Sequence, residues 1–422
     1  MSHQPHLEKK HVRRVLAAGL IGNILEWYDF AVYGFFAAII GEQFFPSDDP
    51  TVSLIAAFGA FAAGFLMRPV GAIFFGRIGD LVGRKRMLFL SVMLMAIPTF
   101  IIGLLPTHET IGYAAAILMV IMRMLQGLSV GGEYTGSIVF LVEHAPAHKR
   151  GFFSSFSMIG ATLGILLGSG MGALITGFLT ESQLESWGWR LPFLIGISIG
   201  LIGFVIRRGL HETPVTEEKS KAPLKELFKA HSKPMFQSIG LNIMGAVCFY
   251  LIFVYMTTWL VTQVHETKST ALDINTISLF VLLLAVPLFA MLSDKIGRKP
   301  MLLTGSFLMA VCAYPLVWLM DHHDFTYILV GQSIFAVILS IFMSTIPSFM
   351  TELFPSRIRA SATSISYNIP YAIFGGTAPM VSVWLISVTD NSEAIAWYLM
   401  AVSILAFIIA LTVKETKGKK LD

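Results

Sequence analysis

Long apolar stretches separated by short polar segments run through the whole of this 422-residue chain. The hydrocarbon core of a bilayer takes about 20 predominantly apolar residues per helix. Transmembrane β-strands would instead appear as short segments of alternating polarity, a pattern that this sequence lacks. We therefore predict an all-α membrane protein with twelve transmembrane helices over residues 14–41, 52–75, 87–106, 111–142, 152–179, 191–210, 236–262, 275–292, 301–320, 326–351, 360–388 and 394–413.

Composition and charge placement support this class. Hydrophobic residues make up 55% of the chain and charged residues only 13%, a balance that excludes a soluble domain. Most of the 30 Lys and Arg residues fall in the terminal segments and in the loops after even-numbered spans, where basic residues mark the cytoplasmic side. We expect a multi-pass protein of the bacterial inner (plasma) membrane, with both termini cytoplasmic. The net charge of +4 then reflects topology and requires no nucleic-acid partner.

Two motifs occur twice in the chain, at nearly the same spacing. Residues 76–85 recur as 290–299, and the Glu-x-x-Pro-x-x-x-Arg motif of 143–150 recurs as 352–359. Parallel repeats of six spans imply two bundles related by an axis along the membrane normal, with a solute site between them near the midplane. The expected division is a first six-helix bundle over 1–210, a cytoplasmic linker over 211–235 and a second six-helix bundle over 236–422.

The repeated motifs place carboxylates and arginines on cytoplasmic loops. Such groups can form ion pairs that close the inner face of the two bundles. The alternative is that the motifs supply only topogenic positive charge and a tight turn. The gating residues predicted on the first interpretation are Asp80, Arg84, Asp294, Arg298, Glu143, Arg150, Glu352 and Arg359.

The duplicated 76–85 motif resembles a loop signature of the major facilitator superfamily. Segments 22–30, 65–71, 126–136 and 187–193 further resemble the metabolite:proton symporters, in particular the proline/betaine transporters. Similar members carry dicarboxylates, citrate or aromatic acids. The resemblance implies proton symport by alternating access. We expect transport from this resemblance but leave osmotic regulation open, because osmoregulatory members often carry a long C-terminal coiled coil, whereas this sequence stops soon after its last predicted span.

Ionisable side chains at membrane depth are costly, so each implies a partner or a role. All eleven histidines fall outside the predicted spans, and no lysine lies in one, so a proton carrier must be a carboxylate. The candidates are Glu26, Asp29 and Glu133, the first two preferred. Alternatively, these charges only tie helices together through Arg68 and Arg123.

The two intramembrane arginines lead to different expectations. Arg123 lies at a depth comparable with Glu26, so an Arg123–carboxylate pair between the first and fourth spans is geometrically feasible. Arg68 lies near the cytoplasmic end of its span, from where we expect it to snorkel to the membrane surface. Arg68 as a second anion ligand is the less favoured alternative.

The inventory of polar groups favours a zwitterionic solute such as proline or glycine betaine. Arg123 would bind its carboxylate, and an acidic or aromatic group would bind its ammonium. The alternative is proton symport of a dicarboxylate, tricarboxylate or aromatic carboxylate such as 2-oxoglutarate or citrate. The predicted substrate-binding residues are Arg123, Gln126, Tyr28, Tyr33, Tyr134, Tyr250, Tyr255, Tyr367, Asn368 and Tyr371.

Other classes of protein fit less well. The sequence contains no G-x-x-x-x-G-K-[ST] nucleotide motif, and its histidines form no catalytic or metal-binding constellation, so neither a pump nor an enzyme is expected. A passive channel is less favoured because it would need neither duplicated gate motifs nor buried carboxylates. We expect a small solute, protons and the lipid bilayer as partners, no obligatory protein partner, no metal, and the proton gradient in place of a cofactor.

Overall fold

The computed structural model describes residues 9–74, 84–143, 145–208 and 223–421, which contain helices and turns but no strand. The first half of the chain comprises α1 (Lys9–Phe35), α2 (Ala37–Phe44), α3 (Pro50–Leu66), α5 (Arg84–Leu104), α6 (His108–Ile111), α7 (Tyr113–Val130), α8 (Glu133–Glu143), η1 (Ala147–Lys149), α9 (Arg150–Phe178), α10 (Glu181–Ser186), η2 (Gly188–Arg190) and α11 (Leu191–Arg208).

The second half follows the short connecting helix α12 (Pro223–Ala230). It comprises α13 (Ser232–Tyr250), η3 (Leu251–Tyr255), α14 (Met256–Thr262), α15 (Lys268–Ile296), α16 (Arg298–Met320), α17 (Phe325–Met343), α18 (Ile346–Leu353), α19 (Ser356–Pro370), η4 (Tyr371–Gly375), α20 (Gly376–Thr389) and α21 (Ala394–Thr412).

These helices agree with twelve membrane spans. Nine helices in the described part are long and apolar enough to cross a bilayer, and a tenth span consists of Asn23–Phe35 and Ala37–Phe44, bent by 66° at the junction of α1 and α2. Two shorter apolar helices, Met93–Leu104 and Gly188–Ile202, lie where the third and sixth spans are predicted. The prediction of an all-α membrane fold is confirmed.

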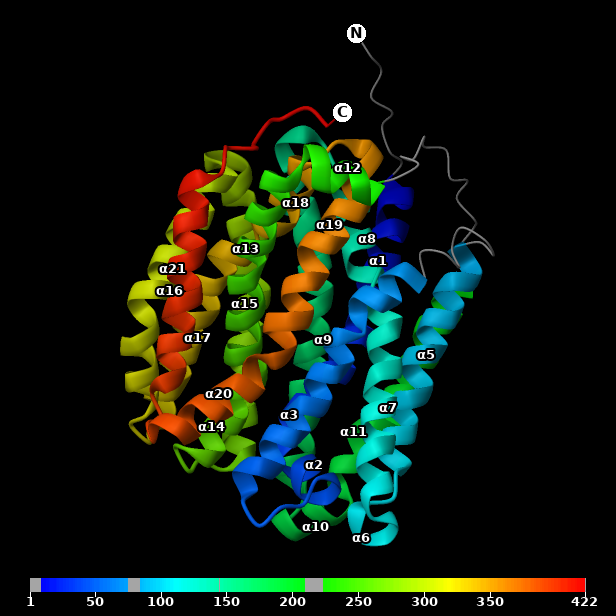
Figure 1. The fold of residues 1–422 in the computed structure, drawn as a ribbon, viewed down its shortest axis with the longest axis vertical. Coiled ribbons are helices and arrows are strands. Elements are labelled where there is room, and N and C mark those ends of the chain that lie inside the picture. Colours follow the sequence, from blue (N-terminus) through cyan, green and yellow to red (C-terminus); the bar gives the residue numbers. More distant parts are fainter. Residues whose placement is uncertain (1–8, 75–83, 144, 209–222, 422) are drawn as a thin grey trace.

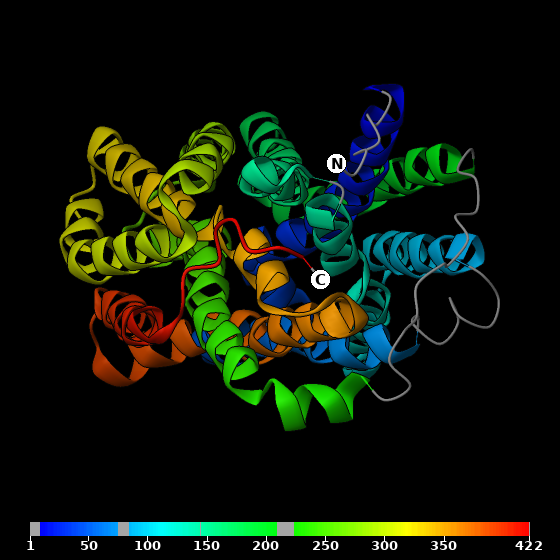
Figure 2. The same ribbon diagram turned by 90° about the horizontal axis from the view of Figure 1, so that it is seen from above.

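The helices form two bundles that stand side by side. Seen from above, the yellow and red helices of the second half lie on the left, and the blue and cyan helices of the first half lie on the right (Figure 2). The first turns of α1, the last residues of the chain and α12 lie at one end, which we call the terminal end (Figure 1). The short helices α2, α6 and α10 lie at the opposite, far end (Figure 1).

Glycines allow the second and fourth spans to pack backbone to backbone. A Cβ atom on Gly127 would lie 1.7 Å from the carbonyl oxygen of Gly64, and one on Gly131 would lie 2.2 Å from that of Arg68. Small residues permit such close approach in membrane proteins. This contact fixes the position of Arg68 against the fourth span. Gly132, by contrast, has nothing within 4 Å of its Cβ position among the described atoms.

Two π-helical segments, η3 and η4, interrupt the seventh and eleventh spans. Segments of this kind occur frequently at functional sites. η4 begins directly after Pro370, a residue that has no N–H to donate to the helix. Tyr250 precedes η3 and Tyr371 begins η4, so both segments place aromatic residues close to the interface between the halves.

Candidate functional site

A buried ion pair lies at the interface between the two halves. Arg68 of the second span and Glu26 of α1 approach to 2.7 Å between Nη2 and Oε1. Arg68 is only 1% exposed, so the prediction that it snorkels to the membrane surface is wrong. The physical reason is that the backbone of Arg68 packs directly against Gly131 of the fourth span, which holds Arg68 inside the protein. Glu26 then compensates the charge of the buried guanidinium.

Aromatic rings surround this pair. The guanidinium carbon of Arg68 lies 5.0 Å from the ring centre of Phe65 and 5.9 Å from those of Trp27 and Tyr367, within the range of cation–π attraction. The ring centres of Tyr367 and Tyr371 stack 3.9 Å apart. We call the following group the central cage: Glu26, Trp27, Arg68, Tyr134, Tyr250, Tyr367 and Tyr371.

The central cage is built from both halves of the chain. Trp27 of α1 stacks on Tyr250 of α13 with ring centres 6.0 Å apart, and Tyr134 of α8 contacts Tyr367 of α19 at 4.8 Å. Asn368, the neighbour of Tyr367, donates to the carbonyl oxygen of Gly131 over 2.9 Å. The structure therefore brings together four predicted tyrosines and Asn368 at the site that the repeat pattern predicted, between the bundles.

A second ion pair lies inside the first half. Arg123 of α7 approaches Asp29 of α1 to 3.1 Å, which confirms the predicted contact of Arg123 with a carboxylate of the first span. Gln126 accepts from Arg123 over 2.7 Å and donates to Thr99 of α5 over 2.9 Å. Thr99 was missed by sequence reasoning, because one hydroxyl in an apolar span carries no signal of its own.

The surroundings of the Arg123–Asp29 pair also belong to the first half. The guanidinium of Arg123 lies over the rings of Tyr33 at 4.4 Å and Phe30 at 4.6 Å. A small cavity beside Asp29 is lined by residues of α1, α5 and α11, including Tyr28. Arg123 and its partners therefore lie among first-half side chains and are not members of the central cage. Phe30 adjoins both arginines, since its ring centre also lies 5.9 Å from the guanidinium carbon of Arg68.

Three further predicted residues are not part of the central cage. The hydroxyl of Tyr28 donates to the carbonyl oxygen of Pro192, and that of Tyr33 donates to the carbonyl oxygen of Ala57, so both tie helices within the first half. Tyr255 contacts Phe58 with ring centres 5.9 Å apart. The side chain of Glu133 lies outside the described part of the structure.

At the terminal end, the repeated Glu…Arg motifs exchange partners between the halves. Glu143 of the first half pairs with Arg359 of the second at 2.7 Å, and Arg150 of the first half lies 3.7 Å from Glu352 of the second. We call these four residues, together with Asp294 and Arg298, the terminal latch. The Glu of each motif copy therefore pairs with the Arg of the other copy, and these ion pairs join the two bundles.

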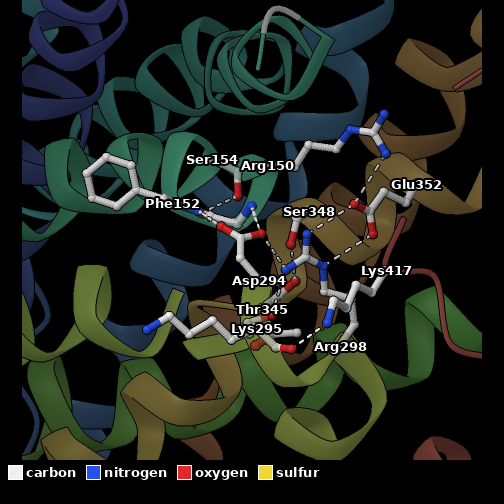
Figure 3. Close-up of polar contacts among 12 residues, drawn as sticks. Arg150, Phe152, Ser154, Asp294, Lys295, Arg298, Thr345, Ser348, Glu352 and Lys417 are labelled. Carbon is white, nitrogen blue, oxygen red and sulfur yellow. Dashed lines mark hydrogen bonds and ion pairs between the residues drawn. The ribbon is translucent and has the colours of Figure 1, made fainter. Parts of the chain in front are cut away.

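Asp294 and Arg298 extend this network (Figure 3). Asp294 accepts from the backbone N–H groups of Gly151 and Phe152 over 2.8 and 2.9 Å, so a second-half carboxylate lies at the N-terminus of α9. This position is favourable for a negative charge. Arg298 pairs with Asp294 at 2.9 Å and with Glu352 at 3.1 Å. Asp80 and the side chain of Arg84, the predicted counterparts, lie outside the described residues.

The last residues of the chain run across the terminal latch. Thr416 donates to Glu352 over 2.7 Å, and Arg150 donates to the carbonyl oxygen of Lys419 over 2.6 Å. Glu415 accepts from the backbone N–H groups of Arg298 and Lys299 over 2.8 and 3.0 Å. Burial raises the pKa of the Glu415 carboxyl, but its backbone hydrogen bonds outweigh burial and hold that pKa below its ordinary value.

The halves also touch at the far end. Lys268, the first residue of α15, donates to the carbonyl oxygen of Phe35, where α1 ends and the chain bends into α2. A cation at the C-terminus of a helix is electrostatically favourable. Ser169 of α9 and Thr276 of α15 approach to 2.8 Å. The two bundles are therefore in contact at both ends and at the central cage.

A structure of two membrane-spanning bundles meeting at a polar cage defines a membrane transporter of the major facilitator type. The family model for "Sugar (and other) transporter" matches residues 15–216 and 210–422, and the chain belongs to this family. The solved structure of the proton:xylose symporter XylE has the same fold, with a TM-score of 0.79, 19% identity and 98% of each chain covered.

Relatives in sequence are transporters. The proline/betaine transporter of Escherichia coli K12 is 36% identical over 425 residues, which cover 97% of this chain and 85% of the relative. The glycine betaine/proline/ectoine/pipecolic acid transporter OusA of Dickeya dadantii is 37% identical, with 98% and 86% covered. A putative proline/betaine transporter of Staphylococcus aureus COL is 36% identical, with 98% and 90% covered.

Proposed function

We propose that this chain is a secondary active transporter that carries a small zwitterion of the proline or glycine betaine type together with protons. The observation that carries the proposal is the central cage, in which one arginine, one carboxylate and several aromatic rings meet between the two halves. A guanidinium binds a carboxylate, and aromatic faces attract a substituted ammonium. The names of the sequence relatives point to the same class of solute.

Alternating access gives the terminal latch its proposed role. The latch closes the terminal end, which faces the cytoplasm according to the placement of basic residues in a bacterial inner membrane. Breaking its ion pairs lets the two bundles rock and opens the cage to that side. The bundles that move are, on this proposal, residues 1–210 and 236–422, joined by 211–235.

The proton gradient supplies enough energy for accumulation. One proton contributes roughly 2.3 kcal/mol per 100 mV of membrane potential and about 1.36 kcal/mol per pH unit. Each contribution corresponds to roughly tenfold accumulation or more. On this proposal the proton binds one of the three predicted intramembrane carboxylates, Glu26, Asp29 or Glu133, of which Asp29 has a cavity beside it.

Purified protein in liposomes, with an imposed pH gradient, tests the proposal. We expect radiolabelled proline or glycine betaine to accumulate inside, and a protonophore to abolish accumulation. Uptake of 2-oxoglutarate, citrate or an aromatic acid in their place would favour the carboxylate-symport alternative. Downhill flux that is indifferent to the pH gradient would indicate a passive channel and contradict the proposal.

A further inference from the structure

The Arg68–Glu26 pair has donor capacity to spare. Arginine carries five N–H donors in a planar fork. In the described part of the chain, Nη2 of Arg68 pairs with Glu26, whereas its Nε has no hydrogen-bond partner. The indole Nε1 of Trp27, next to Glu26 in sequence, is also buried and unpartnered among the described residues. A second anion can therefore bind Arg68 without displacing an existing donor from its acceptor. Arg123 also has two unpartnered nitrogens among the described residues, so the two arginines differ in their surroundings and not in their spare donors.

The pair is also the one that a solute can reach. Tyr367 of the second half lies over the Arg68 guanidinium, and Tyr250 of the second half stacks on Trp27, which lies beside the pair. When the bundles separate, these rings withdraw with the second half and uncover the pair. Arg123 stays enclosed among Phe30, Tyr33 and Phe61 of its own half.

We propose that the solute inserts into the Arg68–Glu26 pair as a complementary pair of charges, its carboxylate on Arg68 and its ammonium facing Glu26. This inference rests on the proposed function and specifies how the zwitterion is recognised. Among the described residues, the empty cage holds one positive and one negative charge, and the loaded cage holds two of each. Its net charge is zero in both states, so neither conformation buries an uncompensated charge, which would be costly.

The same charge count excludes simple ions. A bound anion without an ammonium leaves the cage with a net negative charge, and a bound cation without a carboxylate leaves it with a net positive charge. The Arg68–Glu26 pair is thus the group that selects a zwitterion over a solute that carries only the carboxylate or only the ammonium. The aromatic rings alone would not make this distinction, because they attract any organic cation.

Three probes of nearly the same shape test the proposal by equilibrium binding to the purified, full-length protein in detergent. Glycine betaine carries both charges, 3,3-dimethylbutanoate carries only the carboxylate, and choline carries only the ammonium. We expect the wild type to prefer glycine betaine. In Glu26→Gln the neutral loaded state requires an anion, and the preference should shift toward 3,3-dimethylbutanoate by at least about tenfold.

Arg68→Gln should shift the preference toward choline by a comparable factor. The double variant E26Q/R68Q has no net charge in the cage and tests the proposal independently of any folding defect in Arg68→Gln; it should lose most of the preference among the three probes. Gly132→Ala, at a position with nothing within 4 Å among the described atoms, is the control and should keep the wild-type order of preference. Asp29→Asn removes the carboxylate of the other pair and serves as a comparison for the source of selectivity.

The outcomes separate this inference from the proposed function. Failure of the wild type to bind proline or glycine betaine would overturn the proposed function. Binding of glycine betaine by the wild type, followed by a parallel loss of all three probes in Glu26→Gln and in the double variant, would overturn the inference and leave the transport function standing. A change in the order of preference in Asp29→Asn would contradict the inference, because it would assign selectivity to the Arg123–Asp29 pair inside the first half.

Discussion

The two arginine–carboxylate pairs of the first half have the same chemistry and different surroundings. Arg123 and Asp29, which we call the enclosed pair, lie among first-half rings and are connected to α5 through Gln126 and Thr99. Arg68 and Glu26, which we call the interface pair, lie where second-half rings meet the first half. On the proposed function, alternating access uncovers the surface between the halves, so a solute would reach the second pair but not the first. The residue types show only that each pair is a buried pair of charges. The side chains around a pair determine whether a ligand could contact it.

Arg123→Gln is expected to have the largest effect on stability. The substitution removes the guanidinium that pairs with Asp29 and leaves a carboxylate buried within the first half. Breaking a buried ion pair by removing one partner costs about 3–5 kcal/mol. The measurement is the midpoint temperature of thermal unfolding in detergent.

The double variant D29N/R123Q provides the control, because it removes both charges together. It should recover most of the lost stability, since neither charge remains buried without the other. A midpoint for Arg123→Gln equal to that of the wild type would show that the enclosed pair contributes no net stability. A stabilising role would then not distinguish this pair from the interface pair.

Gly131→Ala should disturb the interface pair through the backbone. Its new Cβ would lie 2.2 Å from the carbonyl oxygen of Arg68 and 2.3 Å from the backbone nitrogen of Ala72. Forcing an extra methyl into a close contact costs about 1–3 kcal/mol. We expect a lower unfolding midpoint and weaker binding of glycine betaine, because Arg68 moves away from Glu26.

The neighbouring glycine offers a matched control. Gly132→Ala adds the same methyl group at a position with nothing within 4 Å among the described atoms. It should leave both stability and binding close to the wild type. Equal effects of the two substitutions would mean that the loss comes from the helix backbone in general and not from the contact with Arg68.

How much of this arrangement the sequence predicts differs between the two pairs. The contact of Arg123 with a first-span carboxylate was predictable, because depth follows from counting residues along two helices. The position of Arg68 was missed because its depth alone suggested the membrane surface. A usable signal existed: Gly64, Arg68 and Gly71 are spaced i, i+4 and i+7 and therefore share one helix face with two packing glycines.

The terminal latch shows a similar division. The repeats predicted which residues take part, and Glu143, Arg150, Glu352 and Arg359 all form ion pairs. The exchange of partners between the halves was not predictable, because it depends on how two bundles pack and not on spacing within one motif. The packing of the two bundles also decides which of the predicted tyrosines lie in the central cage and which lie inside the first half.

Asp29→Asn tests whether the enclosed pair serves proton coupling. Asp29 lies beside a small cavity and is not a member of the central cage, so a proton can bind there without competing with a solute bound in that cage. We expect the variant to exchange solute across the membrane but to lose pH-driven accumulation, which amounts to roughly tenfold per pH unit in a one-proton symporter. The measurement compares counterflow with uptake driven by an imposed pH gradient in liposomes.

Retained accumulation in Asp29→Asn would assign the proton to another carboxylate. Glu26→Gln is the informative comparison, because its carboxylate belongs to the interface pair. The contrary outcome is that Glu26→Gln loses accumulation while still exchanging its preferred probe across the membrane. In that outcome the interface pair serves both solute selectivity and proton coupling.

Asn368→Ala should have the smallest effect, and it acts at the interface alone. The side chain of Asn368 donates to the carbonyl oxygen of Gly131 in the opposite half, a bond that separation of the bundles must break. A hydrogen bond of this kind contributes roughly 0.5–1.5 kcal/mol, so its loss should favour opening by about two- to tenfold. Hydrogen–deuterium exchange of peptides from α8 and α19 measures that opening.

Tyr33→Phe is the matched substitution within the first half, since it removes one hydrogen bond of similar length, from the hydroxyl to the carbonyl oxygen of Ala57. Both members of that bond move together when the bundles rock, so its loss should leave exchange in α8 and α19 unchanged. Increased exchange there in Tyr33→Phe would mean that the interior of the first half deforms during opening. The enclosed pair would then no longer be shielded from the events at the interface.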